Sequence, residues 1–385
     1  MRVGIDITAL TARHTGVDRY LVNLVEHLAQ LPPEARFWVF INREDRPLFR
    51  DRLPPHFTFV ALCLRPRGFR LFFQQIILPL AALLLRLDVV HSPSFIMPLI
   101  RGRARHLLTV HDMTTITMPE LHIPLRRSRL FSFGVLRSIR NAELVCVPSE
   151  AVRRDVEERS HGKSDKIRIV PYGISQRFHP SAADHDGKPL ARLGVSFPYI
   201  LYVGTIEPRK NLARLLHAFA ELVERGAVAE HLVIAGPLGW DYEEILALAG
   251  KSHGRVHLPG FVPEEDLPAV MAGARLFVYP SLREGFGFPP LEAMACGVPV
   301  VATRTSSLTE NLEGAAELVP TDDVAQLGDA MERALQDETL RARLKARGLE
   351  RAARFTWQAT ARAQLAVYRE LLDGGLRTVS GGSSN

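Results

Sequence analysis

The stretch Glu284-Gly-Phe-Gly-Phe-Pro-Pro-Leu-Glu292 decides the fold, because it joins two runs of different secondary-structure preference through a glycine-rich turn. The apolar residues Leu276–Tyr279 before it predict a buried strand. The residues Leu291–Cys296 that continue from it favour a helix, with no breaker before Gly297. The order strand, glycine-rich loop, helix is typical of a parallel α/β sheet.

The same stretch also indicates a ligand. A helix start offers unpaired backbone N–H groups and the positive end of a dipole, and both favour an anion. Gly285 and Gly287 allow the backbone to approach a ligand closely. Glu284 lies in the loop and can accept hydrogen bonds from hydroxyls, while Glu292 lies about one turn into the helix and can reach a second polyol such as a ribose. A phosphate between two hydroxyl-rich groups describes a nucleotide sugar.

A second strand end carries two cations. The predicted strand Tyr199–Val203 leads through a short loop to Arg209 and Lys210, and we expect Asn211 to cap the helix that follows. Fixed cations beside a helix start suit a pyrophosphate. A solvated basic loop is the alternative, and the Glu284 turn in the same half favours the phosphate.

Strands and helices alternate along the whole chain. The strands are predicted at Arg2–Ile7, Phe37–Ile41, Phe57–Leu62, Val89–Val90, His106–Val110, Leu144–Val147, Ile167–Val170, Tyr199–Val203, His231–Ala235, Val256–Leu258, Leu276–Tyr279, Val298–Ala302 and Ala316–Val319. Helices are predicted notably at Val17–Gln30, Asn211–Val223, Glu243–Ala249, Glu264–Ala272, Leu291–Cys296, Val324–Gln336, Glu338–Phe355 and Trp357–Leu372. This alternation predicts two doubly wound, Rossmann-like domains that face an interdomain cleft.

The polar, breaker-rich stretch His179–Phe197 marks the predicted join between the domains. We expect the first domain at residues 1–180 and the second at residues 181–356. A helix at residues 357–373 can cross back to the first domain, and residues 374–385 have the composition of a flexible tail.

Positive charge is concentrated in the first half. Residues 1–180 hold 27 Lys/Arg against 16 Asp/Glu, whereas residues 181–385 hold 21 against 26. The arginines form clusters: Arg65, Arg67 and Arg70; Arg101, Arg103 and Arg105; Arg126, Arg127 and Arg129; Arg137 and Arg140. Such a half indicates a polyanion or an anionic membrane face, or simply a solvated surface. No zinc-finger spacing, RNA-binding aromatic motif or basic-zipper pattern supports nucleic acid.

One apolar segment, Leu71–Leu87, is a membrane candidate. It is short for a spanning helix and contains Gln74, Gln75, Pro79 and Arg86, so a buried or interfacial helix is favoured. The three widely spaced cysteines form neither a disulfide framework nor a metal-ligand spacing, which favours a reducing compartment. We therefore expect a cytoplasmic protein, with peripheral contact at the inner face of the plasma membrane as an option.

Together these motifs resemble retaining glycosyltransferases of the two-Rossmann-domain (GT-B) type in family 4, in the bacterial mannosyltransferase-like branch that builds O-antigen, lipopolysaccharide and exopolysaccharide. The matching segments are Tyr202–Leu212, Gly260–Leu267, Tyr279–Val300 and Val110–Met113. The resemblance covers nearly the whole chain and is most specific in the second domain. It implies that the first domain binds the acceptor and the second the nucleotide sugar.

The resemblance implies a role for each matching residue of the second domain. Glu284 would hold donor-sugar hydroxyls together with the N–H groups of Gly285, Phe286 and Gly287, and Glu292 would bind the ribose. Arg209 and Lys210 would grip the diphosphate and stabilise the leaving group.

Four more positions of the second domain belong to the implied donor site. Gly204 and Thr205 follow the strand before the cations, and backbone groups near Phe261 and Val262 would meet the base.

In the first domain, the resemblance implies that His111 projects into the cleft near the transferred sugar and that Gly16 approaches a ligand. From the residues alone, His111 could equally be a capped loop residue. Asp18 and Arg19 could contact the acceptor, but Asp18 is equally explained as a first-turn acid favoured by the helix dipole. Ser149 is better explained as an N-cap than as a nucleophile.

Preorganised side-chain cations can stabilise a departing diphosphate, so we expect neither a metal nor a cofactor. The motif Asp184-His-Asp186 lies in the predicted linker and is interpreted as coincidence. The resemblance implies transfer on one face of the sugar, with the departing phosphate helping to deprotonate the acceptor.

The expected function is thus transfer of a hexose, mannose in particular, from a nucleotide sugar, GDP-linked in particular, to a glycan or lipid-linked glycan. Two alternatives stay open. One is another reaction on the same fold, such as a nucleotide-sugar epimerase or a phosphorylase. The other is an inactive GT-B-shaped binding module.

Overall fold

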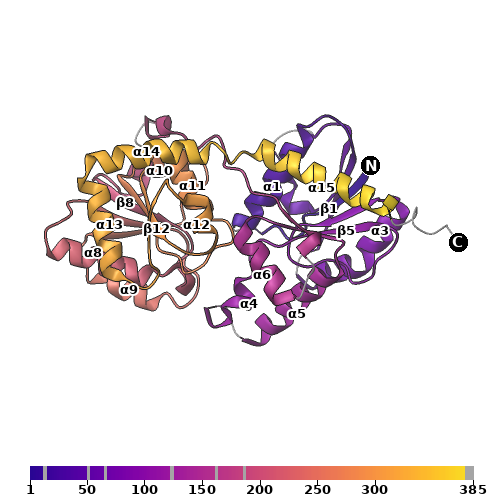
Figure 1. Ribbon diagram of the computed structural model, residues 1–385, viewed down its shortest axis with the longest axis horizontal. Helices are drawn as coiled ribbons and strands as arrows, with labels where there is room; N and C mark the ends of the chain where they lie inside the picture. Colours follow the sequence, from indigo (N-terminus) through magenta and orange to yellow (C-terminus); the bar gives the residue numbers. More distant parts are fainter. Residues whose placement is uncertain are drawn as a thin grey trace. The chain divides into compact units, whose positions relative to one another are not determined.

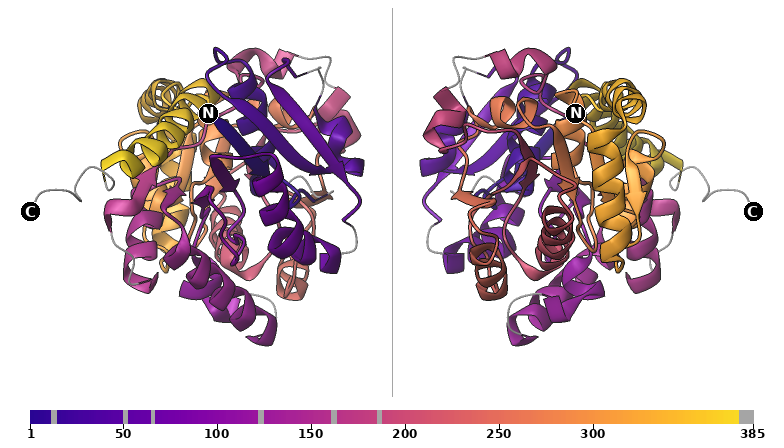
Figure 2. Two further views of the ribbon diagram at one scale, coloured as in Figure 1. Left: turned by 90° about the vertical axis from the view of Figure 1, so that its right-hand side faces the viewer. Right: turned by 90° about the vertical axis from the view of Figure 1, so that its left-hand side faces the viewer.

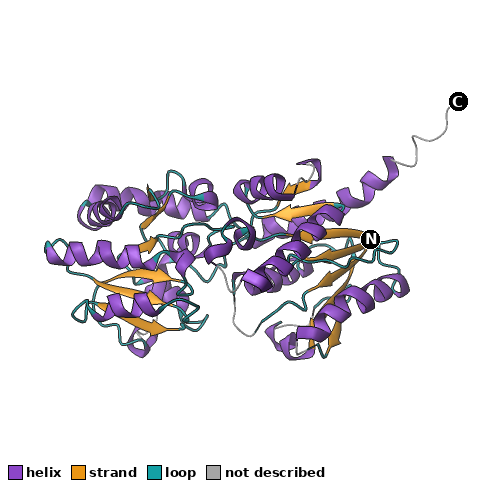
Figure 3. Cartoon of the chain, turned by 90° about the horizontal axis from the view of Figure 1, so that it is seen from below, coloured by secondary structure: helices purple, strands orange, loops and turns teal. Residues whose placement is uncertain are grey.

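The computed structural model describes residues 1–11, 15–49, 53–64, 67–121, 125–160, 164–184 and 188–377. They form two compact units: Met1–Gly173 with the chain from Trp357 onward, and Ile174–Thr356 (Figure 1). Each unit has its own parallel sheet with helices on both faces (Figure 3). The predicted pair of doubly wound, Rossmann-like sheets is confirmed.

The first sheet has seven parallel strands in the order β3-β2-β1-β4-β5-β6-β7, seen in the left panel of Figure 2. Their bounds are β1 Arg2–Asp6, β2 Arg36–Asn42, β3 Phe57–Leu62, β4 Val89–Ser92, β5 Arg105–Thr109, β6 Leu144–Val147 and β7 Ile167–Ile169. The central strands β1, β4 and β5 are short and almost entirely buried, as the strands of a parallel sheet covered on both faces are.

The helices of the first unit include several that the sequence patterns did not predict. The bounds are α1 Gly16–Ala29, η1 Arg43–Leu48, α2 Arg67–Phe72, η2 Phe73–Ile77, α3 Leu78–Leu84, α4 Thr114–Thr117, η3 Pro119–Leu121, α5 Leu125–Asn141, α6 Glu150–Ser160, η4 Ser164–Lys166 and α15 Trp357–Arg377. The helices α5 and α6 were not among those predicted. The elements α2, η2 and α3 form one continuous helix over residues 67–84, in which η2 is a π turn, so the helix predicted in the apolar segment 71–87 ends at Leu84. Ser149 accepts a hydrogen bond from the amide of Val152, so its predicted capping role is confirmed.

The second sheet has six parallel strands in the order β10-β9-β8-β11-β12-β13. The strands are β8 Tyr199–Val203, β9 His231–Ala235, β10 Val256–Gly260, β11 Leu276–Tyr279, β12 Val300–Thr303 and β13 Glu317–Val319. The helices are η5 Pro180–Asp184, α7 Lys188–Arg192, η6 Pro208–Lys210, α8 Leu212–Glu224, α9 Glu243–Gly250, α10 Leu267–Ala272, α11 Phe288–Ala295, α12 Ser306–Leu312, α13 Val324–Gln336 and α14 Glu338–Ala352.

The chain passes from the first unit to the second at Gly173–Ile174, before the stretch His179–Phe197 where the sequence predicts the join. The reason is local packing, because Phe178 and Ala182 are buried and η5 packs against α10. The polar stretch is therefore part of the second unit.

The last helix, α15, belongs to the first unit and packs along α1 (Figure 1). Its Tyr368 hydroxyl lies 2.8 Å from His91 Nδ1, and its Thr360 hydroxyl donates to the carbonyl of Pro171 over 2.8 Å. Trp357 stacks on Tyr172 at an interplanar angle of 12°. The helix thus completes the core of the first unit.

Among the described residues, no helix combines the length and the apolar character needed to cross a membrane. Several sequence predictions fall outside those residues: positions 12–14 of the turn after β1, Arg65, His185 and Asp186 of the Asp-x-Asp motif, and the tail from 378 onward.

Candidate active site

The two predicted ligand-binding loops lie side by side at the middle of the second sheet. β8 and β11 are neighbours at the point where the strand order reverses, and their carboxyl ends lead into Gly204–Asn211 and Pro280–Gly287. The amide of Leu282 donates to the carbonyl of Arg209 over 2.9 Å, which ties the loops together. Doubly wound sheets bind ligands at such a switch point.

Arg209, Lys210 and Glu284 form an ion cluster at this edge. Lys210 Nζ lies 2.6 Å from Glu284 Oε1, and Arg209 Nη1 lies 3.1 Å from Glu284 Oε2. The hydroxyl of Tyr279, the last residue of β11, donates to Glu284 over 3.1 Å and accepts from Lys210 over 3.0 Å. The structure thus brings together three of the four residues predicted to act in catalysis, all of them within one unit.

The carboxyl of Glu284 is held in its ionised form. Burial alone would raise its pKa, but the charges of Arg209 and Lys210 outweigh burial and lower the pKa from 4.5 to about 2. The side chain is only 10% exposed. A permanently charged carboxylate with hydrogen-bonding capacity beyond its two cations can accept bonds from ligand hydroxyls.

A second carboxylate of the cluster, Glu207, was not among the predicted site residues. Its Oε1 lies 2.7 Å from Arg209 Nη2, and Arg209 Nη1 also donates to the carbonyl of Arg283 over 2.7 Å. Glu207 is buried. Its place in the run Glu-Pro-Arg-Lys, two residues before Arg209, was the available signal. The cluster therefore holds two cations and two carboxylates.

Asn211 occupies the N-cap position of α8, as predicted, but it does not have the usual capping geometry. Asn211 has a φ of +56°, in the left-handed region that Asn tolerates better than most residues, and its side chain makes no capping bond. Its amide instead donates to the carbonyls of Pro280 and Thr321, over 3.1 and 3.2 Å. Asn211 thus anchors the cation loop to the loop after β11.

The glycine-rich loop is held from behind by α12, which the sequence analysis did not predict. Ser306 accepts from the amide of Glu284 over 2.9 Å, Ser307 donates to its carbonyl over 2.9 Å, and Asn311 donates to the carbonyl of Phe286 over 2.7 Å. Gly285 lies within this supported turn. Gly287, with a φ of +86°, precedes α11, and a Cβ there would lie 2.6 Å from Leu308. The positive φ favours glycine at 287, and any larger residue would also push the Leu308 side chain aside.

The remaining donor-site residues lie at the same edge of the sheet or close behind it. Glu292 is buried on α11, one turn after its start. Phe261 and Val262 follow β10; Phe261 is 53% exposed, whereas Val262 is buried. Thr205 follows β8 and its carbonyl accepts from the Tyr202 hydroxyl over 3.4 Å. Their contacts with a ligand stay predictions.

Gly204 lies where the backbones after β8 and β9 meet. Its amide donates to the carbonyl of Ala235 over 2.9 Å. A Cβ at the facing Gly236, whose φ is +152°, would lie 2.0 Å from the carbonyl oxygen of Gly204. The two backbones can approach this closely only because position 236 is a glycine.

In the first unit, His111 follows β5 and is buried with both ring nitrogens engaged. Nε2 lies 2.8 Å from the carbonyl of Pro93 and Nδ1 lies 2.6 Å from the hydroxyl of Tyr172. A carbonyl only accepts, so Nε2 carries the proton and Tyr172 donates to Nδ1. Burial lowers the pKa of His111 to about 4. The imidazole is a fixed, neutral group at the carboxyl edge of the first sheet.

The turn after β1 favours the structural explanation of Asp18. Thr15 and Asp18 form a capping box at the start of α1, and Asp18 also accepts from the amide and hydroxyl of Thr11, over 2.9 and 2.8 Å. Asp18 is buried, whereas Gly16 is exposed at the first position of the helix.

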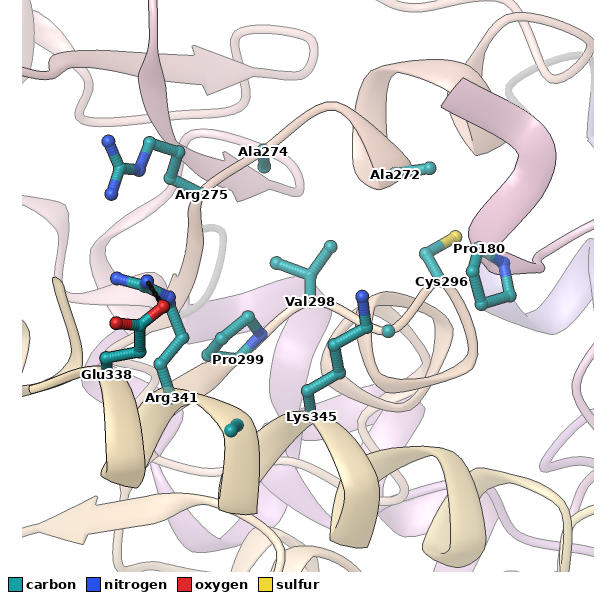
Figure 4. A pocket seen from close by; sticks show the side chains of 12 residues that line it. Pro180, Ala272, Ala274, Arg275, Cys296, Val298, Pro299, Glu338, Arg341 and Lys345 are labelled. Atoms are coloured by element: carbon teal, nitrogen blue, oxygen red, sulfur yellow. Dashed lines mark ion pairs between the residues drawn. The ribbon is translucent and has the colours of Figure 1, made fainter. Parts of the chain in front are cut away.

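A pocket of about 480 Å³ lies at the other edge of the second sheet (Figure 4). It is lined by residues just before β11 and β12, Arg275 and Val298 among them, and by Arg341 and Lys345 of α14. These are the amino ends of the strands, so the pocket is separate from the ion cluster.

Two family profiles match the chain. The profile for glycosyl transferases group 1 matches residues 192–351, and that for glycosyltransferase family 4 matches residues 14–177. O-antigen chain mannosyltransferase B from Escherichia coli is 34% identical over 286 residues, which cover 74% of each chain. The serotype-specific mannosyltransferase WbdA from the same species is 30% identical over 70% of this chain, but only 34% of WbdA is covered.

Solved structures share the fold at low identity. Sucrose-phosphate synthase from Thermosynechococcus elongatus has a TM-score of 0.76 at 22% identity, covering 97% of this chain and 99% of that one. The glycosyltransferase WaaG has a TM-score of 0.71 at 16% identity, covering 94% and 99%. The two Rossmann-like units thus have the GT-B fold, and the family profiles with the 34% identical relative make the protein a glycosyltransferase.

The chain belongs to glycosyltransferase family 4, the glycosyl transferases group 1, in its bacterial mannosyltransferase-like branch.

Proposed function

We propose that the protein transfers mannose from GDP-mannose to a glycan or lipid-linked glycan in O-antigen-type synthesis, with retention at the anomeric carbon and without a metal ion. The observation that carries the proposal is the ion cluster, in which Arg209 and Lys210 are fixed beside the glycine-rich loop. The names of the two mannosyltransferase relatives support the sugar. A protein of the same fold, HepE from Anabaena, was solved with UDP-glucose, which supports a nucleotide-sugar donor.

In this mechanism the second unit binds the donor. The departing diphosphate carries the charge that develops as the glycosidic bond breaks, and Arg209 and Lys210 stabilise it without reorganising. Glu284 keeps both cations in place and accepts bonds from sugar hydroxyls. Glu292 binds the ribose, and the exposed ring of Phe261 offers a surface for the base.

The first unit binds the acceptor. His111, neutral and oriented by Pro93 and Tyr172, contributes a fixed polar group to the first unit's part in the reaction rather than a mobile proton. The acceptor attacks on the face that the diphosphate leaves, and a phosphate oxygen takes the acceptor proton. No step requires a metal-bound water.

Donor binding is tested first by thermal shift with GDP-mannose, UDP-glucose and ADP-glucose. A ligand that binds only the folded protein stabilises it by about 2.7 kcal/mol at a hundredfold excess over its Kd. We expect GDP-mannose to raise the melting temperature most. If none of the three raises it, the proposal fails.

Transfer is tested with Arg209→Met and a matched control, Arg354→Met, whose side chain is 60% exposed and pairs only with Glu350 in the salt bridges of the described residues. Losing one preorganised charge should lower kcat by about a hundredfold, whereas the control should match wild type. The anomeric configuration of the product, read by NMR, tests retention, and unchanged turnover in EDTA tests metal independence. Donor binding without any transfer or hydrolysis would instead favour the inactive binding module.

A further inference from the structure

The continuous helix α2–η2–α3 exposes a broad apolar face to solvent. Five of its side chains, at 69, 72, 76, 80 and 83, recur at spacings of three and four, as one stripe of a helix does. Leu83 and Leu84 at its end are 60% and 82% exposed. The whole apolar face comprises Phe69, Leu71, Phe72, Ile76, Ile77, Leu80, Leu83 and Leu84.

The opposite stripe of this helix already has its core. Phe73, Leu78 and Ala82 are buried in a cluster with Phe40 and Val90 of the first sheet. The helix therefore packs on the sheet through its inner side, and the exposed apolar face takes no part in the core of the unit. Contiguous exposed apolar surface on this scale marks an interaction site.

The π turn η2 attaches a loop that extends the apolar face. Gln74 donates to the carbonyl of Ile96 over 2.8 Å, and Gln75 accepts from the amide of Leu99 over 2.8 Å. Leu99 and the adjacent Ile100 are both exposed. Two glutamines that interrupt the hydrophobic run thus hold two further large apolar side chains beside it.

The surroundings of the apolar face are cationic. Residues 64–111 contain seven arginines and, among acids, only Asp88, whose carboxylate accepts from the amide of Arg2. Residues 121–142 contain five arginines and no acid, whereas Glu143 follows them and pairs with Arg101 over 3.3 Å. The loop places arginines next to the apolar face. Arg101 directly follows Leu99 and Ile100, and Arg103, two residues later, is exposed.

Helix α5 adjoins the same loop and repeats the pattern. Ser138 accepts from the amide of Met97 over 3.1 Å, and Arg101 donates to the carbonyl of Asn141 over 2.8 Å. α5 exposes Leu130 and Phe133 between the exposed Arg129 and Arg137. Large apolar side chains and arginines thus alternate from α3 through the loop to α5.

We propose that this surface docks on an anionic lipid bilayer, with the apolar face in the acyl boundary and the arginines on lipid phosphates. Apolar side chains framed by cations are complementary to such a surface. A second copy of the chain is a poorer occupant, because pairing the face with itself would bring arginines against arginines. The inference goes beyond the proposed function and does not depend on it, since lipid binding is measured without donor or acceptor.

The test is co-sedimentation of the full chain with vesicles of pure phosphatidylglycerol or pure phosphatidylcholine. Wild type should bind the first and not the second, and salt should weaken binding. The variant Leu83→Gln with Leu84→Gln should bind phosphatidylglycerol at least about tenfold more weakly. Its control is Leu238→Gln with Leu246→Gln, which alters two exposed leucines of the second unit.

The charge component is tested with Arg103→Gln together with Arg137→Gln. Each arginine near an anionic surface changes binding by about fivefold, so the pair should cost about 25-fold. Arg354→Gln removes one charge far along the chain, in the second unit, and should leave binding unchanged. Donor-induced thermal shifts should be the same in all of these variants, which separates lipid binding from the donor site.

Three results would overturn the proposal. The first is no sedimentation of wild type with phosphatidylglycerol at low salt. The second is equal binding to both lipids, because the arginines would then have no part. The third is a wild-type dimer that Leu83→Gln with Leu84→Gln dissociates, because a second copy would then cover the face.

Discussion

Replacing Glu284 by Gln keeps the shape of the side chain and removes its charge. In the folded protein this carboxylate is almost completely buried and contacts Arg209, Lys210 and Tyr279. The amide of the variant can still hydrogen-bond, so the change isolates the electrostatic contribution. Arg209 would keep Glu207 and the carbonyl of Arg283, and Lys210 would keep Tyr279.

The magnitude follows from the pKa of Glu284, which falls from 4.5 to about 2 in the folded protein. A difference of about 2.5 units at about 1.36 kcal/mol each gives a contribution of about 3 kcal/mol to the free energy of unfolding. Breaking a buried ion pair typically costs about 3–5 kcal/mol, which agrees. Because the folded pKa lies below the unfolded one, the contribution is complete above about pH 4.5 and is lost as the pH falls toward about 2.

The assay is urea unfolding of wild type and Glu284→Gln at several pH values, with hydrogen exchange of β8 and β11 amides reporting on the second unit. We expect wild type to be more stable by about 3 kcal/mol at pH 7, and the gap to close near pH 2. The control Glu338→Gln alters a carboxylate that is 90% exposed and should change nothing. Equal stability at pH 7, or a gap that persists at the lowest pH, would refute the reasoning.

The first unit should lose stability as the pH falls below about 6.5 toward about 4, because burial lowers the pKa of His91 to about 3 and that of His111 to about 4, so the unfolded chain binds more protons there. Urea unfolding should show a shallower pH slope in His91→Gln, and an unchanged slope would contradict this. Gly236→Ala should abolish folding of the second unit, because its Cβ would clash with the backbone of Gly204. Gly254→Ala should cost only about 1 kcal/mol for its positive φ, because nothing lies within 4 Å of a Cβ there. Circular dichroism and melting temperatures compare the two variants. Asn311→Ala should destabilise the glycine-rich loop and reduce the donor-induced thermal shift, without changing the first unit; a full shift would separate Asn311 from the site.

The fold could be predicted because its signals are local. Buried parallel strands are short apolar runs, and all thirteen appear near their predicted positions. The meeting of the Arg209 loop with the Glu284 loop follows from the same logic, since the order of strands in a doubly wound sheet makes β8 and β11 neighbours. Helix α5 was not predicted because apolar residues such as Leu130 and Phe133 also occupy its exposed side, so its sequence lacks the clear helical periodicity of apolar residues.

The sequence predicted which residues gather in the ion cluster, except Glu207, but not which hydrogen bonds and ion pairs they form. The partners of Arg209 depend on where the buried Glu207 lies in space. The same sequence would be compatible with a solvated loop, so it could not by itself indicate an ion cluster. Asn211 follows a strand and precedes a helix, so the capping rule applied, yet two carbonyls from other loops bind its amide in the left-handed conformation. Such long-range bonds leave no mark on neighbouring residues.

The packing of α15 on the first unit has a consequence for how the chain is made. Residues of this helix, Trp357 and Tyr368 among them, fill the interior beside Tyr172 and His91, yet they emerge from the ribosome after the entire second unit. The middle of the polypeptide is a continuous segment that can mature during translation, while the portion synthesised first must wait for its closing piece. A chain released with its end at position 356 would therefore have a protease-resistant second half joined to a protease-sensitive first half.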